Sequence, residues 1–252
     1  MKIIGVVGGI GPYAGLDLCD KIMKETLVQS DQDHLPIALL SLPEKIEDRS
    51  RYLLGQSKTN PAFAVSEVIQ KLYRIGATHI GIPCNTMHAP GIFNVLTEQV
   101  ENQGLNVQIV NMIEEVISFI RSNHNNIKKI GILSTTGTFK KKIFYNALID
   151  HGIIPVRVSE EIQEEIHEAI YNEEIGIKSK SSPITKRAKN TLVKGIRYLK
   201  DNGAEGVILG CTEIAYAMPY KKLNDLPLLN STQILARSLI NYTNPAKLKS
   251  VD

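Results

Sequence analysis

The sequence predicts an α/β fold of two pseudo-symmetric, doubly wound lobes, each with a mainly parallel four-stranded sheet flanked by helices. Two observations predict it. Short apolar strands alternate with amphipathic helical segments along the whole chain, which is typical of parallel sheets. The plan also restarts halfway, and in each half one strand stops on a cysteine, at Cys84 and at Cys211. We therefore expect two homologous lobes.

The first half contains four expected strands, at residues 3–7, 37–42, 79–82 and 107–110. The first strand runs into the glycine-rich residues 8–12, where glycines allow a tight turn and close approach of a ligand to the backbone. Helical spacing of apolar residues follows Pro12, and further helices are expected at about residues 61–75 and after Cys84 to about residue 102. This order indicates a doubly wound sheet.

The second half repeats the pattern with expected strands at residues 129–133, 153–158, 206–209 and 226–229. The first of these ends in the polar residues 134–138, and the third ends on Cys211. Helices are expected between the strands, including a long one over residues 184–202, and a last helix follows residue 230. The second half therefore predicts another four-stranded sheet.

The spacing of equivalent positions supports a duplication. Gly5 and Cys84 are 79 positions apart, and Gly131 and Cys211 are 80 apart. We expect residues 1–113 and 219–252 to form the first lobe and residues 114–218 the second. The carboxyl ends of parallel strands are where such sheets bind ligands, so the active site is expected in a cleft between the lobes, with one cysteine on each wall.

Composition excludes several classes of protein. The 252 residues carry 29 basic and 26 acidic side chains, a net charge of +3 without the concentrated basic face of a nucleic-acid binder. No apolar run is long enough to span a bilayer, and the N-terminus lacks a signal-peptide core. Three widely separated cysteines do not form a secreted disulfide framework. We expect a cytoplasmic protein with no nucleic-acid or membrane partner.

Two thiols in matching positions suit proton transfer at a carbon atom. One thiolate would take a proton from one face of the carbon while the other thiol donates a proton to the opposite face, which inverts it. Helix N-termini and backbone N–H groups are expected to lower the pKa of each thiol. Backbone N–H groups near residues 85–86 and 212–213 would hold a carboxylate. This chemistry needs neither metal nor cofactor.

At these residues the sequence resembles the cofactor-independent aspartate/glutamate racemase family, and within it the aspartate racemases. The resemblance covers nearly the whole chain, and the two Cys-Thr-type motifs at the right separation are its most specific part. The matching segments are residues 8–12, 31–34, 48–49, 83–88, 112–115, 135–138 and 210–213.

The resemblance implies that Cys84 and Cys211 form a two-base pair without pyridoxal phosphate, in a protein that is commonly a homodimer. It implies a small amino-acid substrate, whose α-amino and carboxylate groups would be held by Asn85, Thr86, Thr135, Thr136 and Thr212. Arg49 would bind a substrate carboxylate by charge-assisted hydrogen bonds.

Two positions depart from the family pattern, and one of them is Asn230, where many relatives carry Asp. Aspartate racemases carry a lysine on the helix after the second strand of the second lobe, where it meets a substrate carboxylate. The expected register places Glu164 there. A carboxylate facing a carboxylate would repel it, which favours a broader substrate range.

Alternatives remain at this point. A broad-specificity or glutamate racemase and a maleate-isomerase-like enzyme share the architecture and both cysteines. A two-lobed binding protein without catalysis would not need the thiols. Cys84 and His88 have the spacing of half a zinc site but lack a good second half, and His88 is expected at the start of a helix or at the rim of the cleft. The 8–12 loop lacks the full dinucleotide-binding spacing.

Overall fold

The computed structural model describes residues 2–251 and divides into two compact units. The first unit contains the chain up to Glu115 together with the chain from Thr232 onward, and the second contains Val116–Ser231. The expected boundary near 113 lies within two residues of the observed one. The second boundary differs, because it falls after Ser231 instead of after residue 218.

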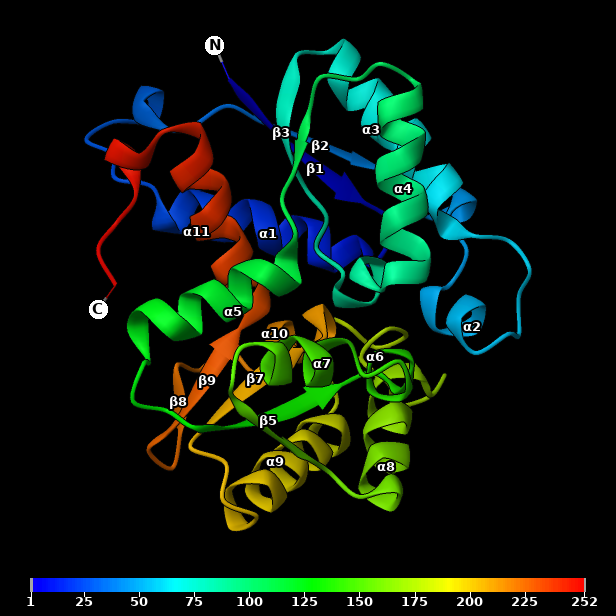
Figure 1. Cartoon of the computed structure of the whole chain (residues 1–252), viewed down its shortest axis with the longest axis vertical. Coiled ribbons are helices and arrows are strands. Elements are labelled where there is room, and N and C mark those ends of the chain that lie inside the picture. The colour runs from blue at the N-terminus through cyan, green and yellow to red at the C-terminus, as the bar shows by residue number, and fades with distance from the viewer. Residues whose placement is uncertain (1, 252) are drawn as a thin grey trace. The chain divides into compact units, whose positions relative to one another are not determined.

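Among residues 2–251, the first unit forms a parallel four-stranded sheet of order β2-β1-β3-β4 (Figure 1). Its elements in chain order are β1 (Ile3–Gly8), α1 (Pro12–Glu25), β2 (Ile37–Ser41), α2 (Arg49–Leu53), α3 (Pro61–Arg74), β3 (Ala77–Gly81), the 3₁₀ helix η3 (Asn85–His88), α4 (Pro90–Asn102), β4 (Gln108–Ile109) and α11 (Ser231–Thr243), which begins at the boundary. Helix α5 (Met112–Asn123) crosses the other boundary.

Both faces of the first sheet are buried. Ile4 and Val6 of β1 pack with α1 and α11, whereas Val7 on the opposite face packs with α3 and α4. An inner strand covered on both sides must be apolar at consecutive positions, and the Ile-Ile-Gly-Val-Val sequence of β1 meets that need.

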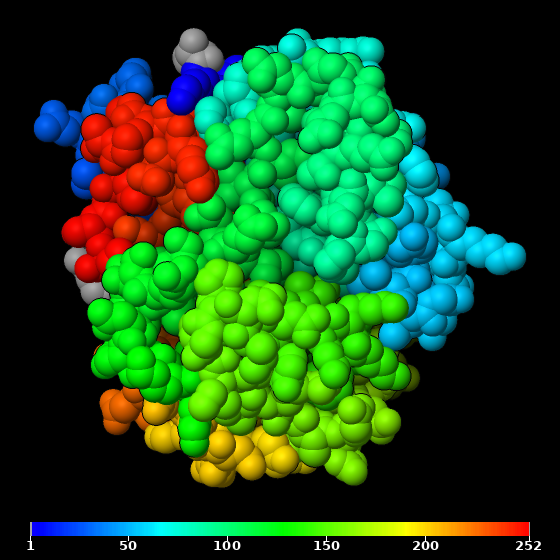
Figure 2. Space-filling view, in the orientation of Figure 1, coloured from blue at the N-terminus to red at the C-terminus, as the bar shows by residue number. Residues whose placement is uncertain are grey.

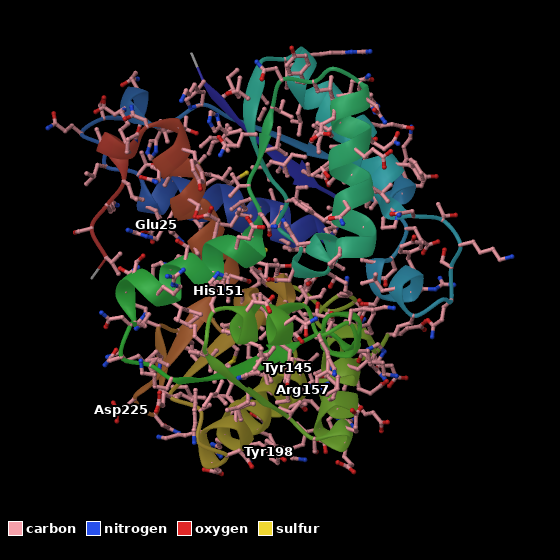
Figure 3. All side chains as sticks on the ribbon, viewed as in Figure 1. Glu25, Tyr145, His151, Arg157, Tyr198 and Asp225 are labelled. Atoms are coloured by element: carbon pink, nitrogen blue, oxygen red, sulfur yellow. The ribbon has the colours of Figure 1, made fainter. Side chains whose placement is uncertain are left out.

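The two ends of the chain meet in the first unit. The terminal segment around Lys247 accepts a backbone hydrogen bond from Leu27 at 2.7 Å, and the N-terminal and C-terminal colours adjoin on the surface (Figure 2). Glu25 of α1, labelled in Figure 3, accepts a hydrogen bond from Gln233 of α11 at 2.7 Å and pairs with Arg237. These contacts fix α11 to α1.

The second unit lies inside the described range and forms a five-stranded sheet of order β6-β5-β7-β9-β8 (Figure 1). Its elements are β5 (Lys129–Ser134), α6 (Thr136–Lys140), α7 (Ile143–Asp150), β6 (Ile154–Arg157), α8 (Glu160–Tyr171), α9 (Lys186–Asp201), β7 (Gly206–Gly210), α10 (Thr212–Ala217), β8 (Lys222–Leu223) and β9 (Leu226–Asn230).

Strands β8 and β9 correct two expectations: the second boundary between the lobes, and the number of strands in the second sheet. Residues 219–231 were expected in the first lobe, but β9 pairs in parallel with β7 in the register Val207 to Leu228, and β8 adds an antiparallel edge strand. The backbone hydrogen bonds of β9 therefore belong to the second sheet. Chain order alone cannot indicate this pairing, because a strand can join either sheet with the same apolar sequence.

Helices α8 and α9 cover one face of the second sheet and pack in one apolar cluster with β5 and β7. On α7, Phe144 lies close to Gly210 of β7, where an added Cβ would come within 2.9 Å of the ring. Within residues 2–251, no helix has the length and apolar character needed to cross a membrane.

Candidate functional site

Cys84 follows strand β3 after Ile82 and Pro83, at the carboxyl edge of the first sheet. It is the residue before the 3₁₀ helix η3, and its backbone is extended. Its exposed fraction is 9 %, and Asn85 and Thr86 beside it are also buried. Since Val6 of β1 pairs with Gly81 of β3, the loop that follows β1 lies beside this segment. The structure thus brings three predicted site residues together at one strand end.

Arg49 connects two loops at the same edge. It begins helix α2 and is 6 % exposed, and its guanidinium donates hydrogen bonds to the carbonyl oxygens of Ile10 and, at 3.2 Å, Glu47. Ile10 lies in the glycine-rich loop after β1. The arginine therefore lies, as a buried positive charge, against the loop that follows the central strand.

The sequence placed His88 at the start of a helix or at the rim of the cleft; it ends η3, two residues before α4, and it is buried. Its Nδ1 lies 2.9 Å from the carbonyl oxygen of Cys84, and its ring stacks on Phe93 at 5.0 Å between centroids. A carbonyl oxygen only accepts, so Nδ1 carries the proton. Burial lowers the pKa of His88 to about 4, although backbone hydrogen bonding opposes the shift. The imidazole is neutral at pH 7 and supports the Cys84 backbone.

This burial predicts a pH dependence of stability. The folded pKa lies below the ordinary value of 6.5, so the unfolded chain binds a proton more readily and stability falls as the pH drops through this window. Between pH 7.5 and pH 5 we expect His88 to cost about 2 kcal/mol of unfolding free energy. Urea unfolding of the wild type and of His88→Asn at both pH values measures it. Equal pH dependence in the two proteins would contradict the prediction.

Cys211 lies directly after strand β7 at the carboxyl edge of the second sheet. It precedes helix α10 and is 4 % exposed. Its thiol donates a hydrogen bond to Oε2 of Glu213 at 3.0 Å, and the Thr212 hydroxyl donates to the same oxygen at 3.1 Å. Lys178 places its Nζ 3.5 Å from Oε1 of that carboxylate. The thiol thus lies in a small charged group.

The pKa of Cys211 does not follow the sequence-based expectation of a lowered value. Burial raises the pKa of this thiol well above its ordinary value, and the Glu213 carboxylate raises it further, whereas Lys178 and the backbone N–H of Ile214 lower it. Helix α10 has only six residues, so its dipole is short. In this arrangement Cys211 is a protonated thiol at neutral pH and can act as an acid.

Thr135 and Thr136 directly follow strand β5, which lies beside β7 in the sheet. Ser134 of β5 pairs with Gly210 of β7, which places the two strand ends side by side. Thr135 is 3 % exposed and caps α6, where its hydroxyl oxygen accepts a hydrogen bond from the Thr138 backbone N–H at 3.4 Å. The predicted residues 135, 136, 211 and 212 are therefore neighbours in the second unit.

Glu164 does not lie where the expected register placed it. It is exposed on α8, whereas its neighbour Gln163 is 2 % exposed and donates through Nε2 to the carbonyl oxygen of Ser134 at 3.0 Å. Gln163 Oε1 accepts no hydrogen bond from the residues that the structure describes. Thus α8 presents a neutral amide to the strand end of β5, and the carboxylate of Glu164 faces solvent.

Sequence reasoning missed three residues of this edge: Gln163, Glu213 and Lys178. Gln163 had a usable signal, because it precedes Ile166 and Ile170 by three and seven positions, and both are buried. Glu213 follows the cysteine by two residues, at the start of a helix that turns it back towards the thiol. Lys178 comes from an irregular loop, and no periodic pattern marks it.

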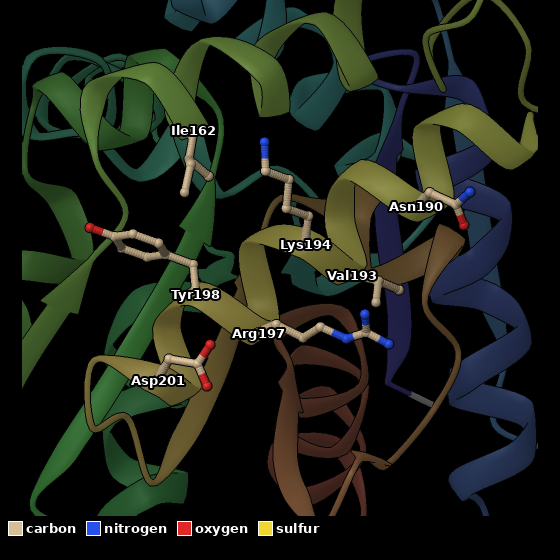
Figure 4. A pocket seen from close by; sticks show the side chains of 7 residues that line it. All are labelled: Ile162, Asn190, Val193, Lys194, Arg197, Tyr198 and Asp201. Atoms are coloured by element: carbon tan, nitrogen blue, oxygen red, sulfur yellow. The ribbon is translucent and has the colours of Figure 1, made fainter.

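Two other polar features of the second unit lie apart from these residues. Arg157 stacks on Phe139 at 3.7 Å, with Tyr145 at 5.8 Å (Figure 3). A pocket of about 380 Å³ opens along α9 (Figure 4). It is lined by Ile162, Asn190, Val193, Lys194, Arg197, Tyr198 and Asp201. The predicted site residues, all of which the structure describes, are not among them.

Known proteins resemble the chain over almost its full length. The model of the Asp/Glu/Hydantoin racemase family matches residues 7–239. The broad-specificity amino-acid racemase RacX of Bacillus subtilis (strain 168) is 24% identical over 246 residues, which cover 95% of this chain and 97% of RacX.

Solved structures also resemble the chain over nearly its full length. The aspartate racemase of Picrophilus torridus superimposes with a TM-score of 0.80 and 28% identity, covering 99% of this chain and 96% of that one. Glutamate racemase from Francisella tularensis, solved with D-glutamate, gives a TM-score of 0.61 at 15% identity over 100% and 84% of the two chains, a likeness of fold alone. The two-lobed α/β fold expected from the sequence is confirmed.

Proposed function

The chain belongs to the Asp/Glu/hydantoin racemase family, and on that basis we propose that it racemises amino acids without pyridoxal phosphate, using Cys84 and Cys211 as its two bases. The observation that carries the proposal is the repeated environment of the thiols. Each is a buried cysteine at the carboxyl end of an inner parallel strand, directly followed by a buried Asn or Thr. A binding protein has no need for this duplication.

In the proposed reaction one cysteine thiolate removes the α-proton of the substrate. The C–H bond breaks, an S–H bond forms, and the electron pair is delocalised into the substrate carboxylate. The opposite thiol then donates its proton to the other face of the carbon, which leaves a thiolate there. After one turnover the two cysteines have exchanged protonation states. Since burial and the Glu213 carboxylate raise the pKa of the Cys211 thiol, Cys211 begins as the acid in this proposal.

The other predicted residues have supporting roles in this proposal. Asn85, Thr86, Thr135, Thr136 and Thr212 supply amide, hydroxyl and backbone groups near the two thiols, and such groups stabilise the negative charge that develops on the carboxylate. Arg49 adds a buried positive charge at the first sheet edge. The homodimer and the cytoplasmic location stay predictions from the resemblance and the cysteine usage.

Aspartate is the first proposed substrate, because the Picrophilus torridus protein is named an aspartate racemase. A specific observation favours broad specificity as the second candidate. The α8 side chain at the end of β5 is Gln163 and not a cation, and its buried Oε1 lacks a donor among the described residues. An unsatisfied buried acceptor costs about 1–3 kcal/mol, which a substrate N–H group would offset. RacX, named for broad specificity, is consistent with this candidate.

The test is proton NMR of the purified protein in deuterated water, with single L-amino acids in separate tubes. We expect the α-proton signal of L-aspartate to disappear and D-aspartate to appear on a chiral column, with no stimulation by added pyridoxal phosphate. Faster exchange of neutral amino acids than of aspartate would assign broad specificity. Isomerisation of maleate without amino-acid exchange, or ligand binding without any exchange, would contradict the racemase proposal.

A further inference from the structure

The carboxylate of Glu213 lies between a thiol and an ammonium group. Its Oε2 accepts the hydrogen bond of the Cys211 thiol at 3.0 Å, and its Oε1 lies 3.5 Å from Lys178 Nζ. The side chains of Lys178 and Glu213 are only 24% and 15% exposed. Limited solvent screening makes such charges act strongly on one another and on the thiol.

Lys178 is held in position by its own loop. The loop folds back on the end of α8, where the backbone N–H groups of Ile177 and Lys178 donate to the carbonyl oxygens of Ala169 at 2.9 Å and Ile170 at 3.0 Å. Ile177 is 1 % exposed in the core of the second unit. The ammonium group also lies 5.0 Å from the centroid of the Tyr171 ring, in cation–π contact. The lysine is therefore directed at Glu213 by a packed segment.

The two charges act on the thiol in opposite directions. A carboxylate that accepts the S–H hydrogen bond stabilises the protonated thiol and repels a thiolate. An ammonium group neutralises part of that carboxylate and attracts a thiolate. Within the second unit, Glu213 and Lys178 are the charged side chains that act on Cys211, together with the backbone N–H of Ile214.

We propose that Lys178 and Glu213 are a pair of positioning residues that balance the thiol and thiolate forms of Cys211. The inference rests on the proposed function, in which Cys211 must give up a proton in one direction of racemisation and accept one in the other. Without Lys178, the Glu213 carboxylate would favour the protonated thiol of Cys211 more strongly. Without Glu213, the Lys178 ammonium group would favour the thiolate of Cys211. The pair keeps both states within reach, and no proton has to move to either residue.

Thiol alkylation measures this balance without a substrate. The variants Lys178→Met and Glu213→Gln, with Lys180→Met as the matched control on the same loop, are treated with iodoacetamide from about pH 6 to about pH 12, because the pKa of Cys211 is raised well above its ordinary value, and the Cys211 peptide is quantified by mass spectrometry. The midpoint of the pH profile carries the result, because access to the buried thiol scales the rate equally at every pH.

We expect Glu213→Gln to move the midpoint of the Cys211 profile to lower pH and Lys178→Met to move it to higher pH. A shift of one pH unit changes the alkylation rate at pH 8 by about tenfold while the thiolate is the minor form. Lys180→Met should match the wild type, and Lys178→Arg should restore the wild-type midpoint because it keeps the charge.

The outcomes separate this inference from the proposed function. Profiles of Lys178→Met and Glu213→Gln that coincide with that of Lys180→Met would overturn the pairing. Shifts of both variants in the same direction would also overturn it, because they would indicate a general packing effect. Opposed shifts in a protein that racemises no amino acid would leave the pairing standing and reject the racemase proposal.

Discussion

Cys84→Ser and Cys211→Ser are each expected to lower racemisation in both directions by a factor of about 10²–10⁴, the usual contribution of one acid–base group. In the proposed mechanism each turnover uses both sulfur atoms, so the loss of either stops inversion from either enantiomer. A serine hydroxyl keeps the approximate size but is a much weaker acid than a thiol and is not a base at neutral pH. Initial rates from D- and L-substrate on a chiral column measure the effect.

Cys19→Ser is the matched control. Cys19 is a half-buried cysteine of α1, and burial raises its pKa to about 11, so it carries almost no thiolate at neutral pH. Its replacement should leave the racemisation rate within about twofold of the wild type, as for a substitution away from the site. A near-full rate in Cys84→Ser or Cys211→Ser would reject the two-base mechanism.

The single-thiol variants also allow the cysteines to be assigned. A variant that retains one thiol can still remove the α-proton from the enantiomer on its side and return deuterium to the same face. We expect exchange without inversion for one enantiomer in Cys84→Ser and for the other enantiomer in Cys211→Ser. Exchange of the same enantiomer in both variants would contradict the placement of one thiol on each face.

The fold was largely predictable because its elements leave local signals. Strand β1 is apolar at consecutive positions because it is buried on both faces, and its equivalent β5 has the same character. The nearly equal separations of Gly5 from Cys84 and Gly131 from Cys211 indicated the repeat. The partner of β9 was not predictable, because its pairing with β7 is a tertiary choice.

The site was predictable at the strand ends and less so around them. Cys84 and Cys211 are fixed by the strands that precede them, so their place at each sheet edge follows from the sequence. The pKa of Cys211 does not follow from the local sequence. It depends on burial and on Lys178, which lies 33 positions earlier in the chain. Whether Gln163 or Glu164 faces the strand end depends on where helix α8 begins. Helix ends are assigned from sequence only to within one or two residues.

The second large effect is expected for Gly9→Ala in the loop after β1. Gly9 has φ of +81°, and a Cβ atom there would lie 2.7 Å from the backbone nitrogen atoms of Leu42 and Pro43. The left-handed backbone costs about 1–2 kcal/mol for a residue with a side chain. The overlap adds about 1–3 kcal/mol, because the atoms in the way belong to the backbone and cannot rotate aside. We expect a total loss of about 2–5 kcal/mol, measured by urea unfolding.

Gly55→Ala separates the two causes. Gly55 has a similar φ of +77°, but a Cβ atom there meets nothing within 4 Å. Gly55→Ala should therefore lower the free energy of unfolding by about 1–2 kcal/mol, the cost of the backbone strain alone. The excess in Gly9→Ala is then the overlap with residues 42–43. Because Arg49 holds the carbonyl oxygen of the next residue, Ile10, relief of that overlap would displace the arginine. A raised KM in Gly9→Ala but not in Gly55→Ala would support a substrate role for Arg49. Equal KM values with a clear difference in stability would instead show that the loop and Arg49 serve only the fold.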